Sequence, residues 1–230
     1  MKAIGGFFEL EIADGDSLYH DGATKLATGR ACLNLILQIK KYNKIFIPYY
    51  CCNALFEPMV LLGINYEFYS INENFEINEN IYLGPNDVII YCNFFGLKSN
   101  YVNKLIAKYE GQIIVDDTHS FFTKGYHDAI SFTTARKYFG VPDGAFLYYP
   151  EKLPQLSFEA NNKISVSHNV NRLIGHNDLA YEQYTAYEDS LDSSINKISL
   201  LSEKILKTVN YLSVQKSRNE NFDFYHEKLE

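Results

Sequence analysis

The sequence predicts an α/β protein with a mostly parallel sheet flanked by helices. Two observations predict this class. Along residues 28–149, short runs rich in β-branched and aromatic residues alternate with longer segments whose apolar residues recur at helical spacing. The runs at 88–91 and 113–115 are apolar at every position, which indicates buried strands.

Each element follows from its local pattern. Segment 28–42 opens at a Thr-Gly pair and repeats Leu and Ile at helical spacing, which predicts a helix. The other expected helices are 51–64 and 100–109, and the expected strands are 44–50, 65–71, 87–96, 111–122, 129–134 and 144–149. In α/β sheets, ligands bind beyond the carboxyl ends of the strands, so the residues that follow these strands are the first candidates for a site.

The pattern changes after residue 149. Residues 151–169 are polar and weakly patterned, which predicts a loop, and 178–212 have a helical pattern with one apolar stripe. Residues 213–230 also have helical propensity. We expect a large domain with trailing helices over 1–212, and the start of an incomplete C-terminal domain over 213–230.

Composition narrows the class of function. The chain has 230 residues, a formal charge of −7, 47% apolar and 21% charged residues, which is typical of a soluble globular protein. The negative charge argues against a nucleic-acid partner, and no apolar run is long enough to span a bilayer. The four cysteines include the pair Cys51-Cys52 but lack metal-site spacing, so reduced thiols and a cytoplasmic location are expected.

The stretch "FTTARKYFGVPDGAFLYY" at 132–149 carries the first candidate, Lys137. A solvated surface lysine is the alternative. However, Thr134 lies three residues earlier, where its hydroxyl could hold an anion, and the glycines that follow predict a sharp turn close to a ligand. Partial burial between apolar strands would lower the pKa of the amine and make it a nucleophile towards carbonyl groups.

Two further segments carry candidate residues. Asp116 ends the buried run "QIIV", and His119 follows three residues later; a turn acid and a core histidine are the alternatives. Thr28, Gly29 and Arg30 open a helix, whose free amides and dipole suit a phosphate, although a simple helix cap is the alternative. A phosphate site, an acid after a middle strand and a later lysine together meet the needs of pyridoxal 5'-phosphate (PLP): an anchor, a partner for the ring nitrogen and a covalent attachment point.

The segments "GRACL", "IPYYCCNAL", "YCNFFG", "IIVDDTHSFF" and "RKYFGVPDGAFLYY" resemble a divergent branch of the DegT/DnrJ/StrS sugar aminotransferases, within the fold type I PLP enzymes. The resemblance covers about 150 residues. It implies that Lys137 binds the cofactor covalently, Asp116 holds the ring nitrogen and His119 lies beside the ring. The expected phosphate ligands are Gly29 and Arg30, through their backbone amides, and the Thr134 hydroxyl.

The sequence departs from this family at three points. Cys51 and Cys52 stand where the family has an aromatic residue stacked on the cofactor, so stacking would either fall to Tyr50 or be weakened. Counting from Ser131 by the common family spacing reaches Arg136 rather than Lys137, but only a lysine can form the covalent link. Family members also continue into a small C-terminal domain, which is the reason for the expected truncation.

The leading hypothesis is a PLP-dependent aminotransferase-like protein. The resemblance implies a nucleotide-linked keto-sugar as acceptor, an amino acid as amino donor, a homodimer, and a setting in polysaccharide or antibiotic-sugar synthesis. The alternative is a non-catalytic homologue that acts as a binding or interaction module. A Rossmann-type nucleotide binder is disfavoured because no GxGxxG follows the first strand.

Overall fold

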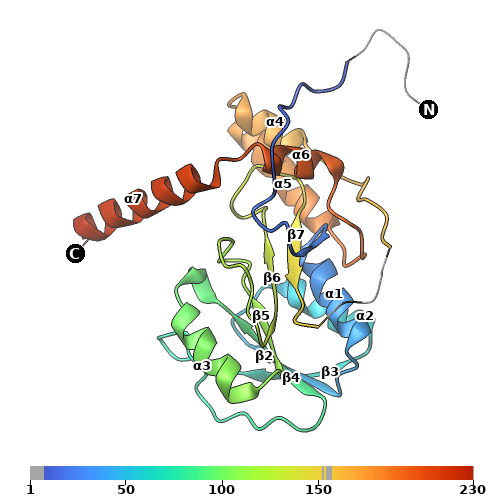
Figure 1. The fold of residues 1–230 in the computed structure, drawn as a ribbon, viewed down its shortest axis with the longest axis vertical. Helices are drawn as coiled ribbons and strands as arrows, with labels where there is room; N and C mark the ends of the chain where they lie inside the picture. Colours follow the sequence, from blue (N-terminus) through green and yellow to red (C-terminus); the bar gives the residue numbers. More distant parts are fainter. Residues whose placement is uncertain (1–7, 152, 154–156, 230) are drawn as a thin grey trace.

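The computed structural model describes residues 8–151, 153 and 157–229. Their core is one seven-stranded sheet in the order β1-β7-β6-β5-β4-β2-β3, with α3 on one side and α1 and α2 on the other (Figure 1). The strands are Thr24–Leu26 (β1), Lys44–Pro48 (β2), Asn65–Tyr69 (β3), Asp87–Cys92 (β4), Ile113–Asp116 (β5), Ile130–Thr134 (β6) and Ala145–Tyr148 (β7). The predicted α/β class is confirmed.

The sheet is mostly parallel, as predicted. Strands β6, β5, β4, β2 and β3 run in one direction, whereas β7 is antiparallel to both β6 and β1. The carboxyl ends of the parallel strands therefore meet at one edge. At that edge Asp116 pairs with Cys92 of β4 and with Phe132 of β6.

Seven α-helices are described: Gly29–Ile39 (α1), Phe56–Leu61 (α2), Ser99–Tyr109 (α3), Ser167–Leu173 (α4), Asn177–Ser190 (α5), Leu200–Lys207 (α6) and Tyr211–Leu229 (α7). Two 3₁₀ turns, Asn53–Leu55 (η1) and Phe94–Gly96 (η2), precede α2 and α3. Helix α1 starts where the Thr-Gly pair predicts it, since the Thr28 hydroxyl accepts from the Ala31 amide at 3.0 Å. Its residues 31–37 are all buried, which explains why six of them are apolar; the seventh, Asn34, donates to the Ser193 carbonyl at 2.8 Å.

The predicted continuous helix over 178–212 is wrong in its middle. Helix α5 ends at Ser190, and residues 191–199 are not helical before α6 begins. The physical reason is that this polar segment finds partners elsewhere. The Ser193 amide donates to Glu57 (2.7 Å), and the Ser199 amide donates to the buried carboxylate of Asp143 (2.9 Å). Serine and aspartate compete with helical bonding in this way, and Ser199 instead caps α6.

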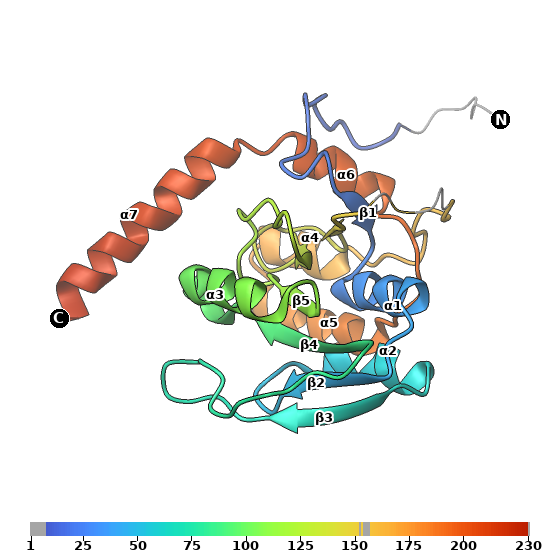
Figure 2. The same ribbon diagram turned by 60° about the horizontal axis from the view of Figure 1, so that its bottom comes forward.

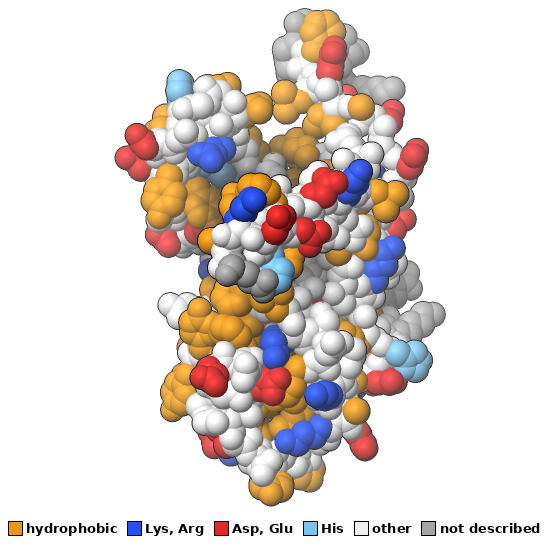
Figure 3. All heavy atoms as spheres, turned by 90° about the vertical axis from the view of Figure 1, so that its left-hand side faces the viewer, with side chains coloured by type: hydrophobic (Ala, Val, Ile, Leu, Met, Phe, Trp, Pro, Cys, Tyr) orange, Lys and Arg blue, Asp and Glu red, His pale blue; other side chains and the backbone are white. Residues whose placement is uncertain are grey.

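The loop predicted over 151–169 is correct for most of its described residues, but α4 begins inside it at Ser167. Helix α7 spans the expected domain boundary, because it starts at Tyr211 and continues to Leu229. Figure 2 shows α7 pointing away from the sheet. None of its residues is buried, and Phe222, Phe224 and Tyr225 are exposed on it. Figure 3 views the molecule from the side towards which α7 projects, and hydrophobic side chains lie among charged ones on that face.

Candidate active site

Lys137 lies in a tight turn directly after β6, at the edge where the parallel strands end. The turn closes because the amides of Tyr138 and Phe139 both donate to the Ala135 carbonyl, at 2.9 and 2.8 Å. The lysine is exposed, so the partial burial expected between the apolar strands is not found, and its Nζ donates to the Thr118 hydroxyl at 3.2 Å. The sheet topology thus brings the amine beside the residues that follow β5.

Asp116 ends β5 next to this amine and is nearly buried. Its Oδ1 accepts from the Thr118 amide at 2.9 Å, and its Oδ2 lies 3.8 Å from the Cys92 thiol. The carboxylate is therefore fixed in orientation on an otherwise apolar strand end. Such a carboxylate can accept a hydrogen bond from a protonated ring nitrogen.

Two cavities meet at Lys137. The first, called the arginine cavity here, has a volume of about 170 Å³, and the second, called the aromatic cavity, about 240 Å³. Both are lined by Cys52, Asp116, Thr118 and Lys137. A ligand that reaches the lysine can therefore extend into either cavity, and the candidate acid lies at their junction.

The arginine cavity is built from the start of α1 and the end of β6. Thr28, Gly29, Arg30, Thr134 and Arg136 all line it. The amides of Gly29 and Arg30 are in the first turn of α1, where a helix offers no acceptor for them. Backbone donors and two guanidinium groups around one space form a suitable environment for a phosphate. The Thr134 hydroxyl already donates to the Gly144 carbonyl at 3.0 Å, so it would have to turn to donate to a phosphate.

Each arginine of this cavity is paired with a glutamate. Arg30 Nε lies 3.4 Å from Glu57 Oε2, and Arg136 forms an ion pair with Glu188 of α5. Nevertheless, among the described residues the buried Nε atoms of both arginines have no hydrogen-bond acceptor. Unsatisfied buried donors are costly, but both Nε atoms are shielded, so an added acceptor can reach either of them only if neighbouring side chains move.

The aromatic cavity is lined by rings and thiols. It contains Tyr50, Cys51, Cys52, Cys92, Phe94, Phe95 and His119 as well as the shared residues. The His119 ring stacks on Phe95 with 5.7 Å between centroids, and its Nδ1 accepts from the Phe95 amide at 3.3 Å. Burial and the nearby Lys137 charge lower the pKa of His119, so the ring is neutral at neutral pH.

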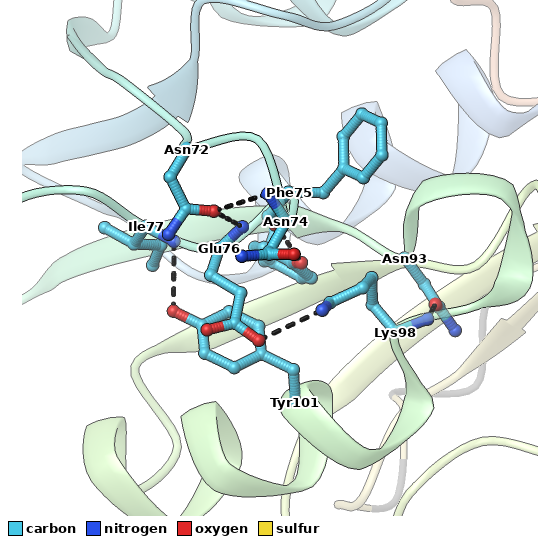
Figure 4. Close-up of polar contacts among 9 residues, drawn as sticks. Asn72, Asn74, Phe75, Glu76, Ile77, Asn93, Lys98 and Tyr101 are labelled. Carbon is cyan, nitrogen blue, oxygen red and sulfur yellow. Dashed lines mark hydrogen bonds and ion pairs between the residues drawn. The ribbon is translucent and has the colours of Figure 1, made fainter.

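The turn that carries Phe95 is unusual and is supported from behind. Phe95 has φ of 55°, a left-handed conformation that is rare for a bulky residue and is concentrated at functional sites. Phe75 packs against both Phe94 and Phe95. The loop that holds Phe75 is in turn tied to α3 by the Lys98–Glu76 ion pair (3.0 Å) and by the Tyr101 hydroxyl (Figure 4).

Asp117, which sequence reasoning did not single out, lies beyond Asp116. It is buried, accepts from the Asn93 side chain at 2.8 Å and is not among the residues that line either cavity. Burial raises the pKa of Asp117 to about 7. Because Asn93 also accepts from the Lys98 amide through its Oδ1 (3.0 Å), Asp117 helps to fix the turn at 93–97.

The "GVPDG" glycines do not approach either cavity of the lysine, contrary to our expectation. A Cβ on Gly140 would meet only Asn169, at 3.8 Å. Gly144 has φ of 125°, and its Cβ would lie 3.0 Å from Ile198, so glycine is required there to pack β7 against the 191–199 segment. The buried Asp143 serves the same purpose, since it accepts from Ser199 and Ser202.

The structure brings all six predicted residues to one place. Lys137, Asp116, Thr134, Gly29 and Arg30 line the arginine cavity, and His119 lines the aromatic cavity with the first two. The sequence analysis did not identify Arg136, Glu188, Phe95 or Tyr184. Arg136 could have been found from its position next to Lys137, whereas Glu188 approaches through tertiary packing and has no local sequence signal.

The fold is that of the PLP fold type I aminotransferases. It matches Spr1654 of Streptococcus pneumoniae, a candidate sugar aminotransferase in its PLP form, with a TM-score of 0.57 and 12% identity over 96% of this chain and 71% of that chain. The resemblance to the sugar aminotransferases predicted from the sequence is thus confirmed at the level of the fold.

Two further solved structures are similar over shorter regions. A DegT DnrJ EryC1 StrS aminotransferase from Brucella abortus matches with 20% identity and a TM-score of 0.43 over 56% of this chain and 43% of that chain. The NtdA protein of Bacillus subtilis with bound PMP matches with 14% identity and a TM-score of 0.47 over 60% of this chain and 38% of that chain. The present chain therefore spans about two fifths of the length of these two relatives.

No protein-family model matches the sequence, and no curated protein does. Among the described residues, no helix is long and apolar enough to cross a membrane. The same part of the chain contains no group of three or more His, Cys, Asp or Glu residues that could hold a metal ion.

Proposed function

We propose that this chain is the cofactor-binding domain of a PLP-dependent aminotransferase-like protein. The observation that carries the proposal is the junction of two cavities at Lys137. One cavity has phosphate-type donors, and a fixed carboxylate, Asp116, lies where the cavities meet. The buried Nε of Arg136, which has no acceptor among the described residues, supports the fit of a phosphate in the arginine cavity.

Each residue has a separate task in this proposal. Lys137 would supply the amine that attaches the cofactor aldehyde and, once released, would move a proton at the substrate carbon as general acid and base. Asp116 would hold the ring nitrogen in its protonated form, and His119 would lie beside the ring. Thr134 and the first turn of α1 at Gly29 and Arg30 would hold the phosphate. When bound, PLP supplies an electron sink for the carbanion that forms at the substrate carbon.

The hydrogen bond from the Phe95 amide determines which ring nitrogen of neutral His119 carries the proton. Because the Phe95 amide donates to Nδ1, the proton of the neutral ring belongs on Nε2. His119 would therefore present an N–H donor, rather than a charge, to the aromatic cavity. A donor there suits a ring oxygen or a hydroxyl group of the bound molecule.

The finer parts of the proposal come from the resemblance to sugar aminotransferases. The acceptor would be a nucleotide-linked keto-sugar and the donor an amino acid. A homodimer is also proposed, and the exposed apolar side chains on α7 are consistent with a further protein contact. Light scattering at micromolar concentration tests the dimer. All four cysteines are free thiols, which is compatible with the proposed cytoplasmic location.

A visible absorption spectrum tests the function directly. On addition of PLP, the protein should develop the band of a lysine-bound cofactor. Addition of an amino acid such as glutamate should then convert this band to that of the amine form. Failure to form the first band would contradict the proposal. A band that forms but does not respond to any amino acid would support the non-catalytic alternative, which the 12% identity to Spr1654 leaves as a second candidate.

A further inference from the structure

We infer that Arg136 is a ligand of the cofactor phosphate and that the Glu188 carboxylate occupies its place until the phosphate binds. The inference rests on the proposed function and adds two residues to it. Arg136 precedes Lys137 in the same turn, and it lines the arginine cavity together with Thr134 and Gly29. A phosphate held there would thus be bound by the residue next to the covalent attachment point.

The guanidinium group of Arg136 is a largely buried charge. Its side chain is only 13% exposed, and the ring of Tyr187 covers the guanidinium at 5.4 Å. A buried guanidinium needs a counter-charge, and Glu188 supplies it through one nitrogen, Nη2. Nε stays buried without an acceptor. A ligand with more oxygens could satisfy both Nη2 and Nε once it displaced this carboxylate.

The two glutamates of the cavity are held differently. Glu57 has a second anchor, because its Oε1 accepts from the Ser193 amide at 2.7 Å while Oε2 faces Arg30. Glu188 lies in the last turn of α5, where the helix dipole disfavours a negative charge, and its side chain is 33% exposed. Arg136 is therefore the main reason for its position. The Glu188 side chain can move into solvent when another anion binds Arg136, whereas the Glu57 side chain is held in place by its second hydrogen bond.

A phosphate dianion would compete well for Arg136. It can accept from Nε and Nη2 at once, and a bidentate, charge-assisted pair is stronger than a single contact. The same group would reach Thr134 and the first amides of α1, which line the same space.

The test compares a ligand with and without the phosphate group. Dissociation constants of PLP and of unphosphorylated pyridoxal are measured by absorbance titration of the wild-type protein, Arg136→Met and Glu188→Gln. Arg136→Met should weaken PLP binding about tenfold or more, which is the usual effect of losing a charged hydrogen bond, and should leave pyridoxal binding unchanged. Glu188→Gln should tighten PLP binding severalfold and likewise leave pyridoxal unchanged.

Two control variants separate this effect from general changes in charge. Glu57→Gln removes the same charge from the anchored glutamate, and Arg172→Met removes an arginine that is tied to Asn177 outside the cavity (2.6 Å). Neither should reproduce the gain or the loss that is specific to PLP. Tighter PLP binding by Glu188→Gln cannot result from misfolding. This variant therefore tests the inference even if Arg136→Met is unstable. Equal PLP affinity in wild type and Glu188→Gln, or equal shifts for PLP and pyridoxal, would overturn the inference.

Inorganic phosphate separates this inference from the proposed function. Phosphate should raise the unfolding temperature of the wild-type protein but not that of Arg136→Met. If PLP fails to attach to Lys137 while this Arg136-dependent stabilisation is present, the anion site stands and the aminotransferase proposal fails. If PLP attaches equally well to wild type and Arg136→Met, the proposed function stands and the inference fails.

Discussion

The arginine cavity and the aromatic cavity share Lys137 and Asp116, but they are held in place in different ways. In the arginine cavity, charged residues far apart in the chain meet: Arg136 with Glu188, and Arg30 with Glu57. In the aromatic cavity, rings from separate segments of the chain stack on one another, and the Phe95 amide donates to His119 Nδ1. The first would select a ligand by charge, and the second by shape and by one fixed donor.

This difference indicates that the two cavities have separate tasks in ligand binding. A phosphate can be recognised by many geometries of donors, so the arginine cavity can tolerate exchange between a protein carboxylate and a ligand. A reacting ring needs one position relative to the amine, and a rigid wall supplies it. The left-handed Phe95 and its supporting loop are such a wall. The following changes test this division, from the largest expected effect to the smallest.

Asp116→Asn should have the largest effect on chemistry. The amide keeps the shape but cannot keep the ring nitrogen protonated, so the cofactor loses its capacity to accept electrons. PLP should still attach to Lys137, whereas the rate of amino-acid-dependent spectral exchange should fall by several orders of magnitude. Stopped-flow absorbance measures this rate. An unchanged rate would remove Asp116 from the role assigned to it.

Asp117→Asn should change stability rather than chemistry, in a pH-dependent manner. The folded state raises the pKa of Asp117 from 3.8 to about 7, so between these values it retains a proton that the unfolded state has lost. The carboxyl therefore contributes stability that is present at low pH and is lost as pH rises towards 7. The variant lacks this loss. As the pH rises from 4 to 8, its free energy of unfolding should therefore increase relative to that of wild type by on the order of 2–4 kcal/mol.

Urea unfolding of both proteins at several pH values measures this difference. Buried His20 has the opposite dependence, because burial lowers its pKa to about 4, but its contribution cancels when the two proteins are compared at the same pH. A constant difference across the range would show that Asp117 is ionised in the folded state.

Tyr50→Ala should have the smallest effect and would test the stacking surface of the aromatic cavity. Tyr50 stacks on Phe94 at 5.8 Å between centroids but is 57% exposed. If it packs on the cofactor ring, its loss should weaken PLP binding by roughly two- to tenfold, the effect of one aromatic contact. Pyridoxal binding should weaken equally, unlike in the arginine variants. Cys52→Ala is the matched control, and a loss confined to this variant would move the stacking role to Cys52.

Much of this site could be predicted from the sequence because its parts are local. Thr28 and Gly29 indicate the start of a helix, and Asp116 follows an apolar run that indicates a buried strand. Lys137 precedes a glycine-rich turn. In a parallel sheet the ends of these strands must converge, so local signals are sufficient to predict the meeting of the residues.

The remaining features depend on long-range contacts. The break at 191–199 follows from hydrogen bonds to Asp143 and Glu57, which are distant in sequence, and the helical pattern of the segment carries no sign of them. The roles expected for Gly140 and Gly144 were wrong for the same reason, since Ile198 rather than a ligand lies against Gly144. The Arg136–Glu188 pair likewise exists only once α5 is in place.

The most direct test of the central claim is the location of covalently fixed cofactor. The protein is incubated with excess PLP, reduced with borohydride and digested, and the modified peptide is identified by mass spectrometry. We predict modification at Lys137 in the wild-type protein and none in Lys137→Ala, whose fold should persist because this side chain is exposed. Modification at another lysine, such as Lys124 over the Tyr19 ring, or none at all, would contradict the account.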